Sequence, residues 1–157
     1  MESKKKVLMI CLGNICRSPI AEAVFIDQMN KLNVQHSWEV DSAALIGYHT
    51  GKGPDHRAMK VLRENGITNY SHKARPITEE DFHTFDWIFG MDNNNISELN
   101  NMKPPNCKAK VELLGRYDPE GKTIIRDPYY DSNSEGFREV YVQCVRSIKA
   151  ILLSGIV

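Results

Sequence analysis

A cysteine and an arginine near the start of the chain are spaced so that both can act on one phosphate group. They are Cys11 and Arg17, at the two ends of the segment CLGNICR. A cysteine thiolate can attack phosphorus, and a guanidinium can hold two phosphate oxygens in a bidentate arrangement. Gly13 and Asn14, which lie between them, tolerate the backbone angles that turn successive N–H groups toward an anion. We therefore predict a phosphate-binding loop with Cys11 as nucleophile and Arg17 as clamp.

The flanking sequence predicts a strand before this loop and a helix after it. Residues 7–11 form a continuous apolar run, which is typical of a strand buried on both faces. Ser18 and Pro19 are typical of the first residues of a helix. The helix N-terminus adds free N–H groups and a positive dipole end, a field that favours the thiolate form of Cys11, and the Ser18 hydroxyl can donate to the sulfur. The spacing of Cys11 and Arg17 alone is a weak signal, and this strand–loop–helix context makes it specific.

A proton donor for the leaving group is predicted in a long loop far along the chain. Expulsion of a phenolate needs an acid, which later serves as the base for water. Asp127 is the candidate, because Pro128 keeps it out of helical geometry and presents it from an extended segment. Tyr129 and Tyr130 follow and can wall a pocket for an aromatic group. From spacing alone an Asp-Pro pair is more often a simple turn, which is our reading of Asp118-Pro119.

Strands and helices alternate along the chain, which predicts a mostly parallel sheet with helices on both faces. We expect strands at 7–11, 38–42, 87–91 and 110–114, and helices from 18, over 55–65, from a capping box at 78–81, over 92–100 and along a final apolar stripe from 137 to 152. Residues 115–132 are a long loop, and such loops often carry function. No repeat or linker divides the chain, so residues 1–157 are expected to form a single domain.

Composition excludes several classes of protein. With 41% apolar and 25% charged residues in 157, the chain is typical of a globular protein. Twenty basic residues balance twenty acidic ones, so no nucleic-acid partner is expected. The apolar run at 150–157 is too short to cross a bilayer, so we expect no membrane association and a cytoplasmic protein. Four cysteines are too few for a disulfide framework, and none has zinc-ligand spacing with His, so no metal is expected.

The run from Val7 to Glu22 resembles the low molecular weight protein tyrosine phosphatases, and the likeness extends to about residue 153. The other segments that carry it are Asp41-Ser42-Ala43, Pro54-Asp55, His72 with Ala74-Arg75, Phe85-Asp86-Trp87-Ile88 with Met91-Asp92, and Asp127-Pro128-Tyr129-Tyr130. The resemblance implies an α/β fold of three layers, in which helices cover both faces of a four-stranded parallel sheet and the phosphate-binding loop follows the first strand.

The resemblance also implies hydrolysis of phosphotyrosine in proteins, and acid phosphatase activity on small aryl phosphates, through a phosphocysteine intermediate without metal or other cofactor. It assigns the nucleophile to Cys11, the phosphate clamp to Arg17 and the general acid and base to Asp127. The expected partners are phosphotyrosine-containing proteins, and the protein is expected to be a monomer or to self-associate weakly.

Supporting roles follow from the same resemblance. It implies that Asn14 holds the loop through a network with Ser42 and His72, and that Ser18 stabilises the thiolate. The implied substrate-binding residues are Leu12, Gly13, Asn14, Ile15, Cys16, Ser18, Tyr48 and Tyr129. Cys16 occupies the position of a cysteine that forms a reversible disulfide with the nucleophile in relatives, although it can equally be a packed side chain. Tyr129 and Tyr130 match tyrosines that kinases phosphorylate in some relatives.

Two departures and three rival functions remain. Arg126 precedes Asp127 where many relatives carry an acid, and a cation there would weaken the proton donor; His49 follows Tyr48 in the variable wall. Arsenate reductases share this loop but need resolving cysteines, and none lies at 92–100. Related bacterial phosphoarginine phosphatases carry Thr at the position of Ile15, where an apolar residue suits phosphotyrosine. A non-catalytic phosphoprotein-binding module is the third rival, although no catalytic residue is missing.

Overall fold

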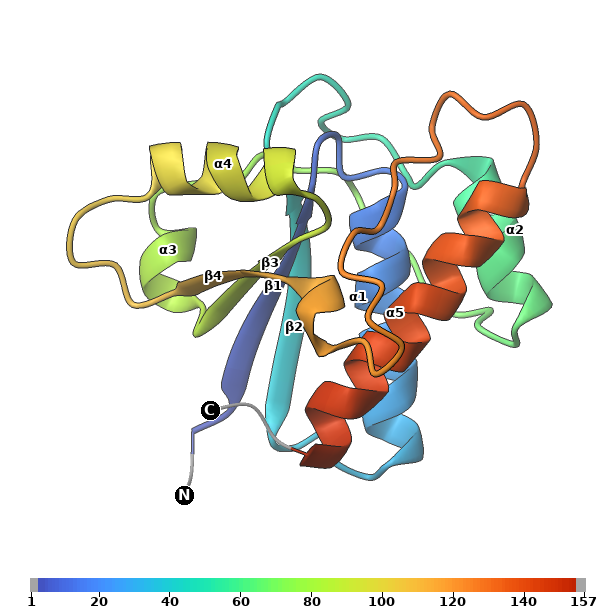
Figure 1. The fold of residues 1–157 in the computed structure, drawn as a ribbon, viewed down its shortest axis with the longest axis horizontal. Helices are drawn as coiled ribbons and strands as arrows, with labels where there is room; N and C mark the ends of the chain where they lie inside the picture. Colours follow the sequence, from blue (N-terminus) through green and yellow to red (C-terminus); the bar gives the residue numbers. More distant parts are fainter. Residues whose placement is uncertain (1–2, 155–157) are drawn as a thin grey trace.

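Four parallel strands form the middle layer of the protein (Figure 1). The computed structural model describes residues 3–154. The strands are β1 (Lys5–Cys11), β2 (Trp38–Ala44), β3 (Trp87–Gly90) and β4 (Lys110–Leu113), in the order β2-β1-β3-β4. Strand β1 is central, because it pairs with both β2 and β3. Its last residue, Cys11, therefore lies at the carboxyl edge of the sheet, where open α/β folds bind their ligands.

Helices cover both faces of this sheet, which confirms the three-layer α/β fold predicted from the sequence. They are α1 (Arg17–Lys31), α2 (His56–Glu64), α3 (Asp81–Thr84), α4 (Asn93–Met102) and α5 (Glu135–Ser154). Helices α1, α2 and α5 lie on one side, and α3 and α4 on the other (Figure 1). Side chains alternate along β1, so Val7 and Met9 enter the first core while Leu8 and Ile10 enter the second. Burial on both faces explains the uninterrupted apolar run of this strand.

The helix signals in the sequence correspond to caps in the structure. The carboxylate of Asp55 accepts a hydrogen bond from the Arg57 amide at 2.8 Å and begins α2, and Gly66 beyond its end has a φ of +83°. The predicted capping box is formed, since the Thr78 amide donates to Asp81 Oδ2 at 2.8 Å and the Asp81 amide donates to Thr78 Oγ1 at 3.3 Å. Aspartate therefore replaces the usual glutamate in this box.

The start of α1 differs from the prediction by one residue. The first helical residue is Arg17, and Cys16 in the cap position makes no side-chain cap bond. Ser18 does not cap the helix, because its hydroxyl contacts the Cys11 sulfur and accepts a hydrogen bond from Asn14 instead. The residue that looked like a helix cap is thus committed to the loop that precedes the helix.

The long loop before α5 is more ordered than its composition predicts. It begins with a short 3-10 helix, η1 (Leu114–Tyr117). Asp118, expected only to begin a turn, also accepts two hydrogen bonds of 2.9 Å from Arg146 on α5. These bonds lower the pKa of Asp118. The first half of the loop is therefore fastened to the last helix.

From residue 3 to residue 154, no helix combines the length and the apolar character that crossing a bilayer requires. Residues 1–2 and 155–157, which belong to the expected domain and include the end of the apolar run at 150–157, lie outside the described part of the chain.

Candidate active site

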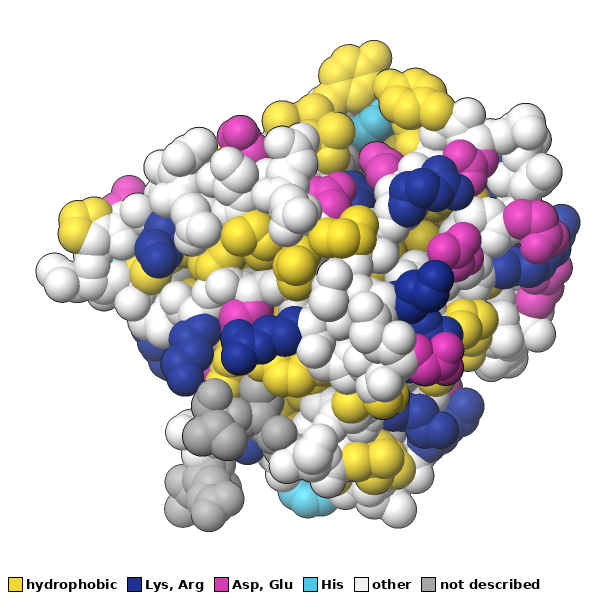
Figure 2. Space-filling view, viewed as in Figure 1, with side chains coloured by type: hydrophobic (Ala, Val, Ile, Leu, Met, Phe, Trp, Pro, Cys, Tyr) yellow, Lys and Arg dark blue, Asp and Glu magenta, His cyan; other side chains and the backbone are white. Residues whose placement is uncertain are grey.

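A pocket of about 370 Å³ opens at the carboxyl edge of the sheet. Figure 2 shows hydrophobic side chains gathered at this edge of the molecule. Three segments that are distant in the sequence line the pocket, and the predicted residues among its lining are Cys11, Leu12, Gly13, Ile15, Cys16, Arg17, Tyr48, Asp127 and Tyr129. Ile46, His49 and Tyr130 complete the lining. Four other predicted residues do not line the pocket: Asn14, Ser18, Ser42 and His72. One set of predicted residues therefore forms the pocket surface, and a second set supports it.

The sulfur of Cys11 is held at the floor of the pocket by a serine hydroxyl. Cys11 is only 3% exposed, and its Sγ lies 3.0 Å from Ser18 Oγ. Because Asn14 Nδ2 donates to Ser18 Oγ at 2.8 Å, the serine oxygen already accepts a hydrogen bond. The Ser18 hydroxyl hydrogen is then free to point toward the sulfur.

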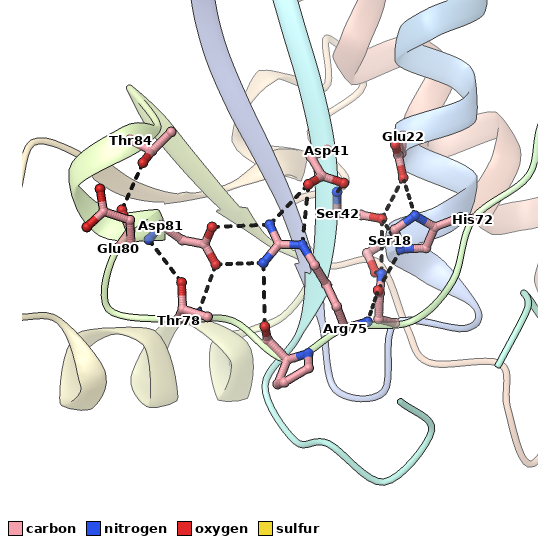
Figure 3. Close-up of polar contacts among 12 residues, drawn as sticks. Ser18, Glu22, Asp41, Ser42, His72, Arg75, Thr78, Glu80, Asp81 and Thr84 are labelled. Atoms are coloured by element: carbon pink, nitrogen blue, oxygen red, sulfur yellow. Dashed lines mark hydrogen bonds and ion pairs between the residues drawn. The ribbon is translucent and has the colours of Figure 1, made fainter. Parts of the chain in front are cut away.

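Asn14 carries the bend of the loop in a left-handed conformation. Its φ is +59°, a region that few residues other than glycine and asparagine adopt. Its Nδ2 also donates to Ser42 Oγ at 3.0 Å, and its Oδ1 lies 2.7 Å from His72 Nε2 and accepts from the Arg75 amide at 3.2 Å. Figure 3 shows Ser18, Ser42 and His72 lying close together in this network. The structure thus brings together the three residues that were expected to hold the loop.

Arg17 lies beside the nucleophile and is almost completely buried, with 2% of its surface exposed. Its Nη1 donates to Asp92 Oδ2 at 2.7 Å and to the Ile125 carbonyl at 2.9 Å. Burial opposes its charge, but the Cys11 sulfur and the carboxylates of Asp92 and Asp127 raise the pKa of Arg17 above its ordinary value. A permanently charged guanidinium with one nitrogen anchored is a suitable clamp for a phosphate dianion.

Asp127 lines the same pocket and lies close to Arg17. Its Oδ2 is 3.7 Å from Arg17 Nη2, and its Oδ1 accepts a hydrogen bond from the Tyr129 amide at 3.1 Å. The side chain is 37% exposed, so it is accessible to a ligand and to water. Nucleophile, guanidinium and carboxylate therefore face one pocket, an arrangement that can transfer a phosphoryl group and a proton together.

The family model for low molecular weight phosphotyrosine protein phosphatases matches residues 6–154. The chain belongs to this family. A pig (Sus scrofa) low molecular weight phosphotyrosine protein phosphatase is 53% identical over 150 residues, which cover 94% of each chain. The solved structure of Primo-1 is similar with a TM-score of 0.92 and 48% identity, over 96% of this chain and 98% of that one. A Drosophila arginine phosphatase structure has a TM-score of 0.87 and 40% identity, over 94% and 96% of the two chains.

Aromatic side chains form the wall of the pocket in this family member. Tyr48 is 77% exposed, and the ring of His49 lies between it and Tyr129, with centroids 4.8 Å and 5.9 Å away. His49 also covers Gly13, since a Cβ at position 13 would lie 2.8 Å from His49 Cδ2. Gly13 is thus needed for the close approach of this wall, whereas the left-handed residue of the loop is Asn14 and not Gly13.

A buried carboxylate supports the loop from below. Glu22 Oε1 accepts hydrogen bonds from Ser42 Oγ at 2.6 Å and from the Tyr70 hydroxyl at 2.7 Å, and it lies 3.4 Å from His72 Nδ1. Burial raises the pKa of Glu22 more than the bonds from Ser42 and Tyr70 lower it. Neither Glu22 nor Tyr70 was predicted as a functional residue, because in the sequence each is an isolated residue with no pattern around it.

The same region contains a group of potential metal ligands, Glu22, Asp41 and His72, whose ligand atoms lie within 4.8 Å of one another. Their polar atoms are already bonded to the protein. Asp41 accepts from the Ser42 amide at 2.8 Å and from Arg75 Nη2 at 3.1 Å. The Arg75 guanidinium, which also pairs with Asp81 (Figure 3), supplies the positive charge beside this group.

Asp92 is the other functional candidate that sequence reasoning missed. It was expected only to begin a helix, and its Oδ1 does cap α4 by accepting from the Asn95 amide at 2.7 Å. Its second oxygen orients Arg17. The position of Asp92 directly after β3 was a usable signal, but only once β3 is known to lie beside β1.

Proposed function

We propose that this protein hydrolyses phosphotyrosine in proteins, and small aryl phosphates, through a phosphocysteine intermediate. The observation that carries the proposal is the convergence of Cys11, Arg17 and Asp127 on one pocket, with 3.7 Å between Asp127 Oδ2 and Arg17 Nη2. All three come from one chain, so residues 1–157 act as a single phosphatase domain that needs no second copy for chemistry.

In the first step the Cys11 thiolate attacks phosphorus and a sulfur–phosphorus bond forms. The bond from phosphorus to the phenolic oxygen breaks, and Asp127 gives its proton to that oxygen. Arg17 Nη1 is held by Asp92 and Ile125, which leaves the rest of the guanidinium to bind the phosphoryl oxygens. The positive charge of Arg17 is therefore in position before the reaction begins, and it neutralises the negative charge of the phosphoryl oxygens.

In the second step water attacks phosphorus and the sulfur leaves as a thiolate. The Asp127 carboxylate takes the proton of that water, so the acid is regenerated and inorganic phosphate is released. The Ser18 hydroxyl, 3.0 Å from Cys11 Sγ, stabilises the departing sulfur. Because Asp127 must carry a proton at the start of each cycle, activity on aryl phosphates is expected to increase toward acidic pH, as in an acid phosphatase.

The walls of the pocket support phosphotyrosine as the substrate. Ile15, Tyr48 and Tyr129 present apolar and aromatic surfaces on which a phenyl ring can stack. A phosphoarginine side chain would place a charged guanidinium against the apolar Ile15 instead. Because the chain is similar to an arginine phosphatase, comparing phosphotyrosine with phosphoarginine as substrates tests this assignment.

Purified protein should hydrolyse a phosphotyrosine peptide in the presence of EDTA, at least about tenfold more efficiently than the same peptide with phosphoarginine, as discrimination by one side-chain pocket allows. The measurement is kcat/KM from released phosphate, with a phosphoserine peptide as a second comparison. A preference for phosphoarginine, or turnover that depends on added metal, would contradict the proposal.

We further propose that Cys16 protects the enzyme against oxidation. We also propose that the protein works in the cytoplasm, where thiol reductants would reduce the disulfide again. Peroxide converts the Cys11 thiolate to a sulfenic acid, and the Cys16 thiol then displaces water from it to form a disulfide. Both cysteines line the pocket and are free in the structure. Burial, with the nearby charges of Cys11 and Asp55, raises the pKa of the Cys16 thiol, so Cys11 is the cysteine that peroxide oxidises first.

A Cys16→Ser variant should therefore be inactivated by peroxide without recovery. Wild-type protein should regain most of its activity after dithiothreitol, whereas the variant should regain little, because its sulfenic acid proceeds to sulfinic acid. Cys107→Ser is the matched control, since Cys107 lies in a loop outside the pocket and should behave as wild type. Equal recovery in all three proteins would remove Cys16 from this role.

A further inference from the structure

Arg126 and Asp131 form an ion pair, and they lie on either side of Asp127, our general acid, in the sequence. Arg126, immediately before Asp127, donates from Nη1 to Asp131 Oδ1 at 2.9 Å and from Nη2 to Asp131 Oδ2 at 2.7 Å. The same Nη1 reaches the Asp127 backbone carbonyl at 3.2 Å. The guanidinium is thus fixed on the Asp131 carboxylate and on the backbone of Asp127, and not on the Asp127 side chain.

Arg57 holds the backbone around Asp131. Arg57 Nη1 donates to the Asp131 carbonyl and Nη2 to the Tyr129 carbonyl, each at 2.8 Å. Arg57 is in turn oriented by Asp55 and lies 4.5 Å over the ring of Phe137. The Asp131 side chain therefore faces Arg126 from an anchored backbone.

The first turn of α5 leaves room for this pair. A Cβ at Gly136 would lie 2.2 Å from Asp131 Oδ2 and 2.8 Å from Arg126 Nη2. A Cβ at position 136 would therefore displace the ends of these side chains, and it would also lie 3.0 Å from Pro128 Cβ. The Arg126–Asp131 pair therefore occupies space that is left by the missing side chain of Gly136.

The Arg126–Asp131 pair adds little to the stability of the fold. The side chains are 58% and 26% exposed, and exposed ion pairs contribute little to stability. What the pair does change is the position of a positive charge. A guanidinium that approaches a carboxylate favours its ionised form and so opposes its use as a proton donor.

We propose that Asp131 is a positioning residue that holds the Arg126 guanidinium away from the Asp127 carboxylate. The inference rests on the proposed function of Asp127 as general acid. The charged and titratable groups around Asp127 come from three segments. The loop and α1 supply Cys11, Cys16 and Arg17, the wall after β2 supplies Tyr48 and His49, and its own loop supplies Arg126, Tyr129 and Tyr130. Arg126 faces Asp131 and, from α5, Glu139.

The pair also persists as the pH falls. Hydrogen bonds from Arg126 lower the pKa of Asp131, so Asp131 stays ionised and keeps its partner as the pH falls. Asp131 thus continues to hold the guanidinium in the conditions in which the acid is used.

The test uses Asp131→Asn, which frees Arg126 without changing the size of the side chain. We expect kcat/KM to fall about 3- to 10-fold for phenyl phosphate, a fraction of what general acids contribute, and less than about twofold for p-nitrophenyl phosphate, whose leaving group needs little protonation. The basic limb of the pH profile of kcat/KM should move to lower pH. Gly136→Ala, which displaces the pair by another route, should give the same pattern.

The deciding variant is the double substitution Arg126→Gln with Asp131→Asn. If freed Arg126 causes the loss, removing it should restore both the phenyl phosphate rate and the pH profile. Glu135→Gln is the control, because it removes a carboxylate from the same surface that pairs with Arg138 rather than Arg126. It should match wild type.

Two results would overturn the inference. A double variant as impaired as Asp131→Asn would show that the pair only braces the loop, and an Asp131→Asn enzyme with the wild-type profile would show that Arg126 needs no restraint. Asp127→Ala, measured alongside, separates these results from a failure of the proposed function. If its loss does not depend on the leaving group, Asp127 is not the acid, and the positioning role fails with it.

Discussion

Replacing Cys11 with serine should abolish turnover of aryl phosphates and phosphotyrosine peptides while leaving phosphate binding largely intact. The serine hydroxyl is a far weaker nucleophile at neutral pH than a thiolate, so a loss of about 10⁴-fold or more in kcat is expected. The rest of the phosphate site does not depend on the sulfur. Arg17 stays anchored by Asp92 and Ile125, and Asn14 keeps its bonds to Ser42 and His72.

Two measurements on the Cys11→Ser protein check this expectation. Steady-state hydrolysis of p-nitrophenyl phosphate reports the chemistry, and titration with inorganic phosphate by calorimetry reports the site. Cys107→Ser controls for the loss of a thiol outside the pocket. Residual turnover above about one per cent of wild type would exclude Cys11 as the sole nucleophile, because a covalent step cannot proceed without it. Loss of phosphate binding would instead indicate that the sulfur shapes the loop.

The sheet could be predicted from the sequence because its central strand is buried on both faces. Val7, Leu8, Met9 and Ile10 are all 0% exposed, and such burial leaves an uninterrupted apolar run in the sequence. The order of the strands could not be predicted in the same way. Parallel pairing joins residues far apart in the chain, and no local pattern records which strand is the neighbour of which.

The missing strand order explains why the partners of Arg17 were missed. Asp92 follows β3 and Ile125 lies in the loop before α5, so both reach Arg17 only because β3 lies beside β1 and that loop crosses the carboxyl edge. The Cys11–Arg17 loop itself is local, and its glycine, asparagine and serine could be interpreted directly. Local chemistry was predictable, whereas its long-range supports were not.

Ser18 shows the opposite case, in which a local rule predicted the right residue for a different purpose. Serine before proline is typical of a helix cap, but here the same hydroxyl interacts with Cys11 and Asn14. Short polar side chains favour any nearby backbone or side-chain partner, and the loop offered a closer one than the helix. The helix starts one residue earlier as a consequence, at Arg17.

Arg126 is a further example of a residue whose side-chain contacts could not be predicted from its neighbours in the sequence. Its place before Asp127 predicted a weakened acid. The structure directs its guanidinium to Asp131, and that contact depends on the turn at 128–131 and on the space above Gly136. Side-chain direction, unlike adjacency, is set by the tertiary structure.

Asp127→Ala should separate leaving groups by their need for a proton. For phosphotyrosine or phenyl phosphate, whose phenolate leaves reluctantly, we expect kcat/KM to fall about 10²- to 10³-fold, the range typical of general acid catalysis. For p-nitrophenyl phosphate the loss should be about tenfold or less, because nitrophenolate leaves without help. The variant should also lose the basic limb of the pH profile, since no group then needs to hold a proton.

A series of substituted phenyl phosphates checks this directly. The logarithm of kcat/KM should depend only weakly on the acidity of the leaving phenol in wild type and steeply in the variant. Asp127→Asn keeps the shape of the side chain and its bond from the Tyr129 amide but cannot act as the acid, so it should follow the alanine variant. If the two variants lose the same factor on every phenol, Asp127 holds the substrate rather than protonating it. A steep dependence in both would place the proton on Asp127, because Asp127 is the one carboxylate among the described residues that line the pocket.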